Sequence, residues 1–138
     1  MKKLLFAASM LACTYAANSQ QLTFNINQSG ASYKNRVGQY EEAQLKDENI
    51  VIKMQNQVVQ VMDDKASSIK LDKIEQQKKV NMYTYSQVGY GKDASNNPVT
   101  FKFTINTKSK QAVVELSGKG AKNYYFGTCN YDEKLSKL

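Results

Sequence analysis

The sequence contains no histidine, so the side chains that could do chemistry are few. Histidine is the commonest general base near neutral pH, the commonest zinc ligand and the usual partner of a serine or cysteine nucleophile. Its absence argues against many classes of enzyme at once. The residues that follow Cys129 are polar or acidic and supply no positive charge to lower the pKa of its thiol. We therefore expect no catalytic residue and no enzymatic activity.

Two short spacings resemble site motifs. Ser67 and Lys70 have the Ser-x-x-Lys spacing, but that chemistry needs a helix, and the apolar residues that follow alternate as in a strand. Asp93, Ser95 and Asn97 have the alternate oxygen spacing of a calcium loop, but a proline follows where that loop requires glycine. We interpret the first as chance and the second as a hairpin turn, and we expect neither a metal nor a cofactor.

The N-terminus predicts export from the cytoplasm. Two lysines precede an apolar run from Leu4 to Ala12, which is the pattern of a secretory signal and is too short to span a bilayer. Small residues at Ala17 and Ser19 suit signal peptidase. We expect a signal peptide at residues 1–19 and one mature domain at residues 20–138, located in the periplasm or secreted.

A second processing route uses the cysteine of the same segment. The sequence Met10-Leu11-Ala12-Cys13 resembles a bacterial lipobox, in which Cys13 would carry a lipid anchor and hold the protein at the envelope. Membrane contact is expected only by this route. Cleavage after Ser19 would instead leave Cys129 with no partner for an intramolecular disulfide.

The charge of the mature chain is mildly basic. Loss of Lys2 and Lys3 lowers the basic residues from 19 to 17 against 12 acidic ones, which gives a net charge of +5. Arg36 is the single arginine, whereas recognition of phosphates and bases favours the guanidinium group. We therefore expect no nucleic-acid partner. The positive balance favours solubility and a weak preference for anionic envelope surfaces or glycans.

Most of the chain shows the period of two that is typical of strands with one buried face. The segments with this pattern are residues 22–26, 50–54, 58–62, 69–71, 80–88, 99–105, 112–116 and 124–126. They are joined by short polar turns and include no repeat. We predict an all-β fold, an antiparallel meander of about eight strands that forms a small barrel or a sandwich, with minor helix at most.

The polar stretch of residues 28–49 is the exception to this pattern. It could hold a short helix supported by Glu42 and Lys46 at i,i+4, or a polar edge strand that begins near Gln39. The sequence leaves both alternatives open.

The order of these segments resembles small exported bacterial β-domains of unknown function. The hairpin of residues 50–62, the strand at Ile69, and the pair of strands from Val99 to Leu116 followed by Tyr124-Tyr125-Phe126 carry the resemblance. The order is also loosely similar to that of lipocalin-like calycins. Their Gly-x-Trp signature is absent, with Gly38-Gln39-Tyr40 as a distant substitute. The resemblance implies a meander barrel that holds an apolar ligand.

A candidate ligand site follows from the strand order. If residues 99–106 and 111–116 form a hairpin, the loops before and after this pair lie at one end of the sheet. Lys92, Lys119 and Lys122 would then gather beside Tyr90, away from the turn that joins the two strands. Such a cluster could receive the acidic head group of a ligand whose apolar part is buried.

These patterns predict a non-enzymatic β-domain that binds a small apolar or amphipathic acidic ligand at the cell envelope. The alternative is a protein-interaction module, an envelope assembly factor or an inhibitor, which would use a sheet edge or the face of Tyr83 and Tyr85. The partner is then a small ligand or an envelope protein. The sequence makes no prediction of oligomeric state.

Overall fold

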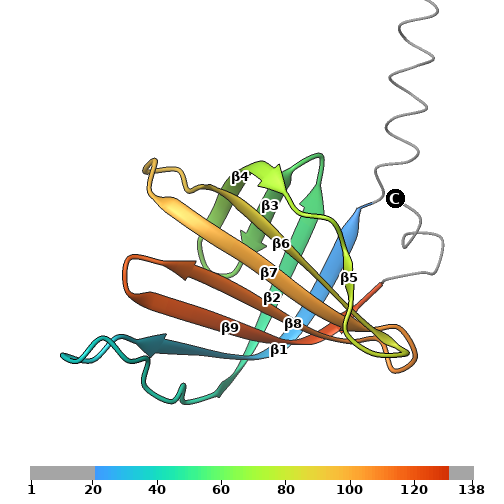
Figure 1. The fold of residues 1–138 in the computed structure, drawn as a ribbon, viewed down its shortest axis with the longest axis horizontal. Coiled ribbons are helices and arrows are strands. Elements are labelled where there is room, and N and C mark those ends of the chain that lie inside the picture. Colours follow the sequence, from blue (N-terminus) through green and yellow to red (C-terminus); the bar gives the residue numbers. More distant parts are fainter. Residues whose placement is uncertain (1–20, 131–138) are drawn as a thin grey trace, which may run out of the picture.

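The computed structural model describes residues 21–130, which form nine antiparallel strands. These are β1 (Leu22–Tyr33), β2 (Lys46–Gln55), β3 (Val58–Met62), β4 (Ala66–Ile74), β5 (Lys78–Lys79), β6 (Thr84–Lys92), β7 (Pro98–Asn106), β8 (Gln111–Gly118) and β9 (Ala121–Cys129). Consecutive strands pair from β1 to β4 and from β6 to β9, β4 pairs with β6, and β9 pairs with β1 (Figure 1). Eight strands therefore close a barrel, and β5 adds a short extra strand beside β6.

The predicted all-β meander is confirmed, and its form is a barrel rather than a sandwich. Within residues 21–130, no helix is long and apolar enough to cross a membrane.

The core consists of the inward side chains of every long strand. Phe24, Phe101 and Ile105 are fully buried, and Phe103 is 1% exposed. The ring of Phe103 lies with its centroid 5.5 Å from that of Phe24 and 5.7 Å from that of Phe101, in tilted contacts that suit aromatic pairs. The three rings therefore fill the middle of the barrel, where each contributes about 2 to 3 kcal/mol by burial.

A β-bulge in β1 changes which side chains face the core. The pairings of β1 with β2 and with β9 both shift between Ile26 and Gln28. Opposite β9 the extra residue is Asn27 of β1, whereas opposite β2 the extra residue is on β2. Before the bulge, even-numbered residues such as Ile26 point inward. After it, Ser29 lies opposite Tyr125 on the inner face, while Ser32 lies on the outer face.

Both predictions for residues 28–49 are wrong. Residues 28–33 continue β1, and the segment that follows joins β1 to β2 without a helix. Lys46 begins β2 and forms an ion pair with Glu48 at 3.4 Å, instead of supporting a helix with Glu42. The bulge explains the error, because it shifts the alternation of β1 in the middle of the strand. The strand predicted at residues 80–88 likewise begins later, at Thr84.

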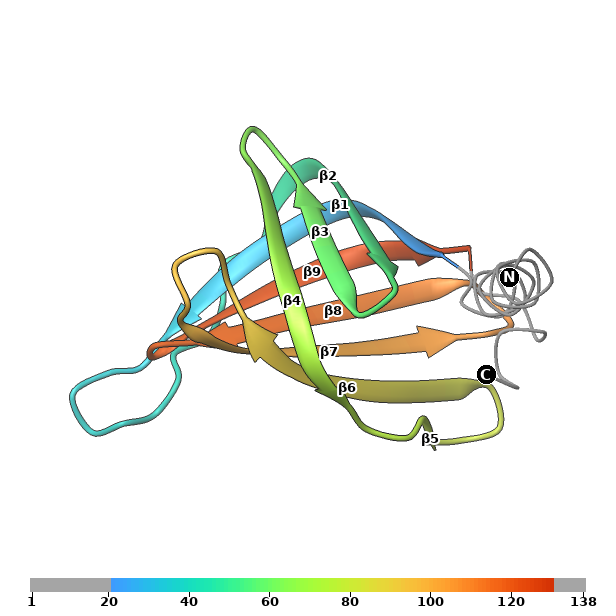
Figure 2. The same cartoon turned by 90° about the horizontal axis from the view of Figure 1, so that it is seen from above.

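The connections divide between two ends of the barrel. We call one end the mouth, which carries residues 34–45, 63–65, 93–97 and 119–120. The opposite end, the base, carries the turn at 56–57, the segment 75–83, the turn at 107–110 and both ends of the described chain. Figure 2 shows β5 at the base and the loop after β1 at the mouth.

Among the described glycines of the barrel wall, Gly127 on β9 leaves the least room for a side chain. A Cβ atom there would lie 1.9 Å from the carbonyl oxygen of Asn25, a backbone atom of β1 that cannot move without opening the seam. We expect Gly127→Ala to lower the free energy of unfolding by at least about 2 kcal/mol, measured by urea denaturation. Gly118→Ala is the control, because its Cβ would lie 3.2 Å from the nearest atom. Equal stability of the two variants would contradict the tight seam.

Candidate functional site

The segment of residues 34–45, which we call the strap, lies against the outer wall of the barrel. The amide of Glu41 donates to the carbonyl of Tyr33 at 3.0 Å, and the hydroxyl of Ser32 donates to the carbonyl of Glu41. Gly30 allows this contact, because a Cβ there would lie 2.8 Å from a carbonyl oxygen of the strap. The strap is therefore fixed at several points to the outer face of β1.

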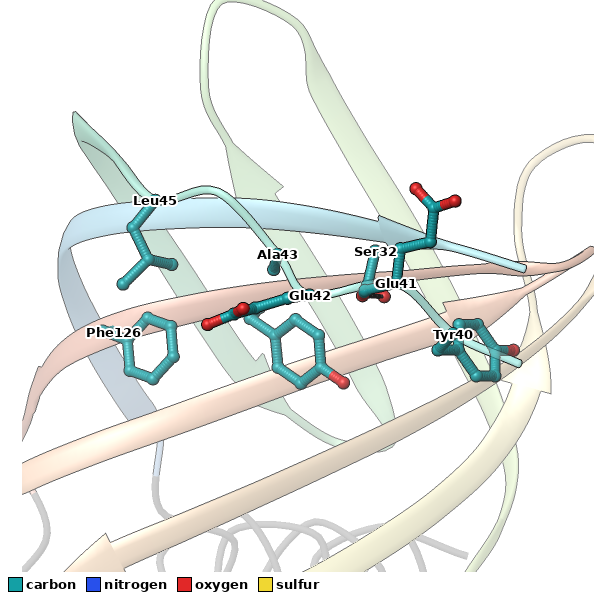
Figure 3. Close-up of a pocket in the computed structure, with 8 residues that line it drawn as sticks. Ser32, Tyr40, Glu41, Glu42, Ala43, Leu45 and Phe126 are labelled. Atoms are coloured by element: carbon teal, nitrogen blue, oxygen red, sulfur yellow. Dashed lines mark hydrogen bonds between the residues drawn. The ribbon is translucent and has the colours of Figure 1, made fainter. Parts of the chain in front are cut away.

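An open groove of about 460 Å³ lies between the strap and the wall. Its lining residues are Ser32, Tyr40, Glu41, Glu42, Ala43, Leu45, Tyr124 and Phe126. Leu45 points from the strap toward Phe126 on β9, and Tyr40 lies at the opposite end (Figure 3). Tyr124 and Phe126 are two residues apart on the outer face of β9. We call this feature the strap groove, and its floor is largely aromatic.

Two lysines lie near the ring of Tyr40, which lines one end of the strap groove. The Nζ atoms of Lys122 and Lys34 lie 4.4 Å and 5.5 Å from the centroid of the Tyr40 ring. A cation over an aromatic face is attracted to the ring, whereas two cations on one ring repel each other. An anionic group placed here would relieve that repulsion. Glu41 and Glu42 also line the groove, and their carboxylates can accept hydrogen bonds from a ligand.

The mouth also has polar side chains on its inner face. The Ser29 hydroxyl donates to Glu48 Oε2 at 2.5 Å, and Lys46 Nζ lies 3.4 Å from the same oxygen. Tyr125 lies one strand away, opposite Ser29. Burial raises the pKa of the Tyr125 phenol, and the negative charges of Asp63 and Glu48 raise this pKa further. The inner wall thus changes from apolar at the centre to polar at the mouth.

The lysines predicted as a ligand site all lie at or near the mouth, but on different surfaces. Lys122 points outward on β9, opposite Ser32, and forms part of the Tyr40 contact. Lys92 ends β6, and Lys119 lies in the turn between β8 and β9. Lys119 is close enough to Asp93 for its charge to contribute to lowering that carboxyl pKa, although the main cause is the hydrogen bond from the Asn97 amide.

Tyr90, the fourth member of that predicted site, lies on the outer wall. Its hydroxyl donates to Glu75 Oε1 at 3.0 Å, and this hydrogen bond is the main reason that the Tyr90 pKa is raised. Tyr90 is paired with Thr100 on β7. The phenol of Tyr90 is therefore hydrogen-bonded to the residue that follows β4, and it lies away from the strap groove.

The tyrosines predicted as a partner face do not share one face. Tyr85 lies opposite the fully buried Ile105, so it belongs to the inner face of β6 near the base. Tyr83 precedes β6 and is 43% exposed, with Lys108 Nζ 5.2 Å from its ring centroid. Of the two, Tyr83 is the one offered to solvent.

The structure shows where the residues of the two short site-like motifs lie. Ser67 and Lys70 lie three residues apart in β4, so they point to opposite faces of the barrel wall. The carboxylate of Asp93 accepts the amides of Ser95 and Asn97 at 3.0 Å and 2.9 Å, which closes the turn between β6 and β7. Within residues 21–130, no three histidine, cysteine or carboxylate side chains form a group that could hold a metal ion.

Of the two cysteines, only Cys129 lies within the described residues. Cys129 is 4% exposed and lies opposite Phe24 on the inner face of the barrel, as a small apolar side chain of the core. Cys13 and the predicted signal peptide, residues 1–19, lie outside the described residues.

The sequence did not point to the strap groove as a site. Tyr40, Tyr124 and Phe126 entered only through the resemblance to other β-domains and calycins, and Leu45 did not stand out. The available signal was the small outward pair Gly30 and Ser32, which leaves room for a covering segment. Recognising it required the bulge, which sets the face of both residues.

Comparison with protein-family models, curated proteins and solved structures gives no match to this chain.

The raised pKa of Tyr125 makes a testable prediction about stability. The folded protein holds the phenol proton more tightly than the unfolded chain does, so this stabilisation is complete below about pH 10 and is lost as the pH rises through the folded pKa. The unfolding free energy of the wild-type protein should therefore fall more steeply above pH 10 than that of Tyr125→Phe. Parallel curves in urea denaturation from pH 8 to 11.5 would contradict the burial of this phenol.

Proposed function

We propose that this protein is a non-enzymatic, exported β-barrel that binds a small amphipathic acidic ligand, with the strap groove as the binding site. The observation that carries the proposal is an open groove with an aromatic floor, one of whose lining residues, Tyr40, has the ammonium groups of Lys34 and Lys122 over its ring.

The apolar part of the ligand would lie on the floor of the groove. Leu45, Tyr124 and Phe126 offer apolar surface, and aromatic faces accept flat aliphatic or sugar rings. Leu45 is 50% exposed, so covering it with a ligand removes apolar surface from water. The hydroxyl of Ser32 is occupied by the strap carbonyl and is a structural group here.

The acidic part would lie beside Tyr40, between Lys34 and Lys122. A carboxylate or sulfate there pairs with both ammonium groups and reduces their mutual repulsion. Glu41 and Glu42 would repel further negative charge along the groove but would accept hydrogen bonds from hydroxyl or amide groups. The site therefore suits a ligand with its negative charge at one end, rather than a polyanion.

The closed meander barrel supports the resemblance to lipocalin-like calycins. That resemblance implies a ligand inside the barrel. Here the contacting rings of Phe24, Phe101 and Phe103 occupy the centre, which favours a site on the outer wall.

The proposal includes export to the periplasm or the medium, directed by a signal peptide at residues 1–19. The alternative is a lipid anchor at Cys13.

The second candidate is a protein-interaction module. Its support is the exposure of Tyr83, which lies at the base, far along the chain from the strap. It differs from the proposal in its location, because Tyr83 lies at the base and the strap groove lies against the outer wall near the mouth.

The test is calorimetric titration with oligosaccharides that carry a single terminal uronic acid and with medium-chain fatty acids, with neutral oligosaccharides and fatty alcohols as comparators. We expect an acidic series to bind and its neutral counterpart to bind more weakly. Lys122→Ala and Phe126→Ala should each weaken binding by about tenfold or more, because each removes one contact at either end of the groove.

The matched control is the double variant Lys92→Ala with Lys119→Ala, which removes two mouth lysines away from the strap groove. It should bind as the wild-type protein does. Loss of binding in this control, with Lys122→Ala and Phe126→Ala unaffected, would move the site to the mouth lysines. Binding of neutral and acidic probes alike would overturn the preference for an acidic ligand.

A further inference from the structure

A turn at the base presents apolar side chains to solvent. This turn, residues 78–83, which we call the tip, includes Val80 and Met82, whose exposed fractions are 61% and 71%. Tyr83 beside them is also partly exposed. Side chains of this size are normally buried, and a soluble monomer rarely gathers them at the end of a loop without a binding role.

The tip is held in a defined shape rather than left loose. The amide of Val80 donates to the carbonyl of Thr84 at 2.8 Å, and the side chain of Asn81 accepts the amide of Tyr83 at 3.1 Å. The carbonyl of Tyr83 in turn accepts both the amide and the hydroxyl of Thr107, at 2.7 Å and 3.1 Å. These bonds fix the apolar side chains beyond the edge of the sheet.

Positive charge surrounds the tip. Lys78 and Lys79 form β5 within it, and the neighbouring turn between β7 and β8 contributes Lys108 and Lys110. Lys108 Nζ lies 5.2 Å from the centroid of the Tyr83 ring, which joins the two turns into one surface. Neither residues 76–83 nor residues 106–111 include an acidic residue.

Both ends of the described chain lie at the base, next to the lysine-bearing turn. The amide of Asn130 donates to the carbonyl of Thr23 at 3.2 Å, and the amide of Cys129 donates to the carbonyl of Lys110 at 2.9 Å. The described chain therefore begins and ends next to the lysine-bearing turn. The apolar run from Leu4 to Ala12 precedes this entry point, so attachment through the N-terminus would bring the base toward a membrane.

From these observations we infer that the base docks on an anionic lipid bilayer, with Val80 and Met82 inserted among the acyl chains and the four lysines over the head groups. Tyrosine suits the boundary between the two. A second copy of the chain is disfavoured, because pairing two bases would bring like charges together. This inference goes beyond the proposed function, which concerns the mouth, and beyond the sequence, which predicted membrane contact only through Cys13.

The test is sedimentation of the protein, as recovered from an exporting cell, with vesicles of phosphatidylglycerol and phosphatidylethanolamine or of phosphatidylcholine alone. We expect binding to the anionic vesicles that weakens at high salt. The double variant Lys78→Glu with Lys79→Glu should bind at least about tenfold more weakly. The matched control, Lys65→Glu with Lys119→Glu, makes the same charge change at the mouth and should bind as wild type does.

A second measurement locates the insertion without relying on affinity. A polarity-sensitive fluorophore on Met82→Cys should shift to shorter wavelength with anionic vesicles, whereas the same probe on Val37→Cys, an exposed strap position, should not. Both positions are exposed, so neither variant threatens the core. Equal shifts at the two sites, no effect of the Lys78 and Lys79 reversal, or a Met82 probe that responds to a protein partner but not to vesicles would overturn the inference.

Discussion

Closure of the barrel between β1 and β9 is the constraint on which the rest of the structure depends. β1 passes so close to β9 that the carbonyl of Asn25 occupies the space of a side chain at Gly127. The bulge at Asn27 lies at the same place and reverses the alternation of the strand. Without the bulge, Ser32 would face the interior and the polar half of β1 would disrupt the apolar core.

The same reversal creates the outer shelf on which the strap lies. Gly30 and Ser32 turn outward, one leaving room for the strap backbone and the other donating a hydrogen bond to it. Ser29 turns inward and meets Glu48, which makes the inner wall polar near the mouth. One extra residue therefore accounts both for the filled apolar centre and for the groove on the outside.

The fold was largely predictable from the sequence, because alternation survives wherever one face of a strand is buried. Phe101, Phe103 and Ile105 illustrate this, since the predicted inward face is the buried one. The alternation cannot show a bulge, because an extra residue simply looks like the end of the pattern. The closure of the barrel was also hidden, since it joins residues about a hundred positions apart.

The candidate site was less predictable than the fold. Strand order places Lys92, Lys119 and Lys122 toward one end, but only the pairing register shows which of them turns toward the strap. Tyr85 illustrates the same limit, because its strand began later than its sequence suggested and its partner is the buried Ile105. A polar segment such as the strap shows no alternation of polar and apolar residues, so its sequence does not indicate which surface it packs against.

The central claim is that the strap is fixed to the wall before any ligand binds, so that the groove is preformed. Hydrogen exchange of the Glu41 amide tests this directly, because that amide donates to the carbonyl of Tyr33 at 3.0 Å. In the absence of ligand, we expect this amide to exchange at least about a hundredfold more slowly than in an unstructured peptide. Exchange at the rate of an unstructured peptide would mean that the strap is detached, and the account of the groove would be wrong.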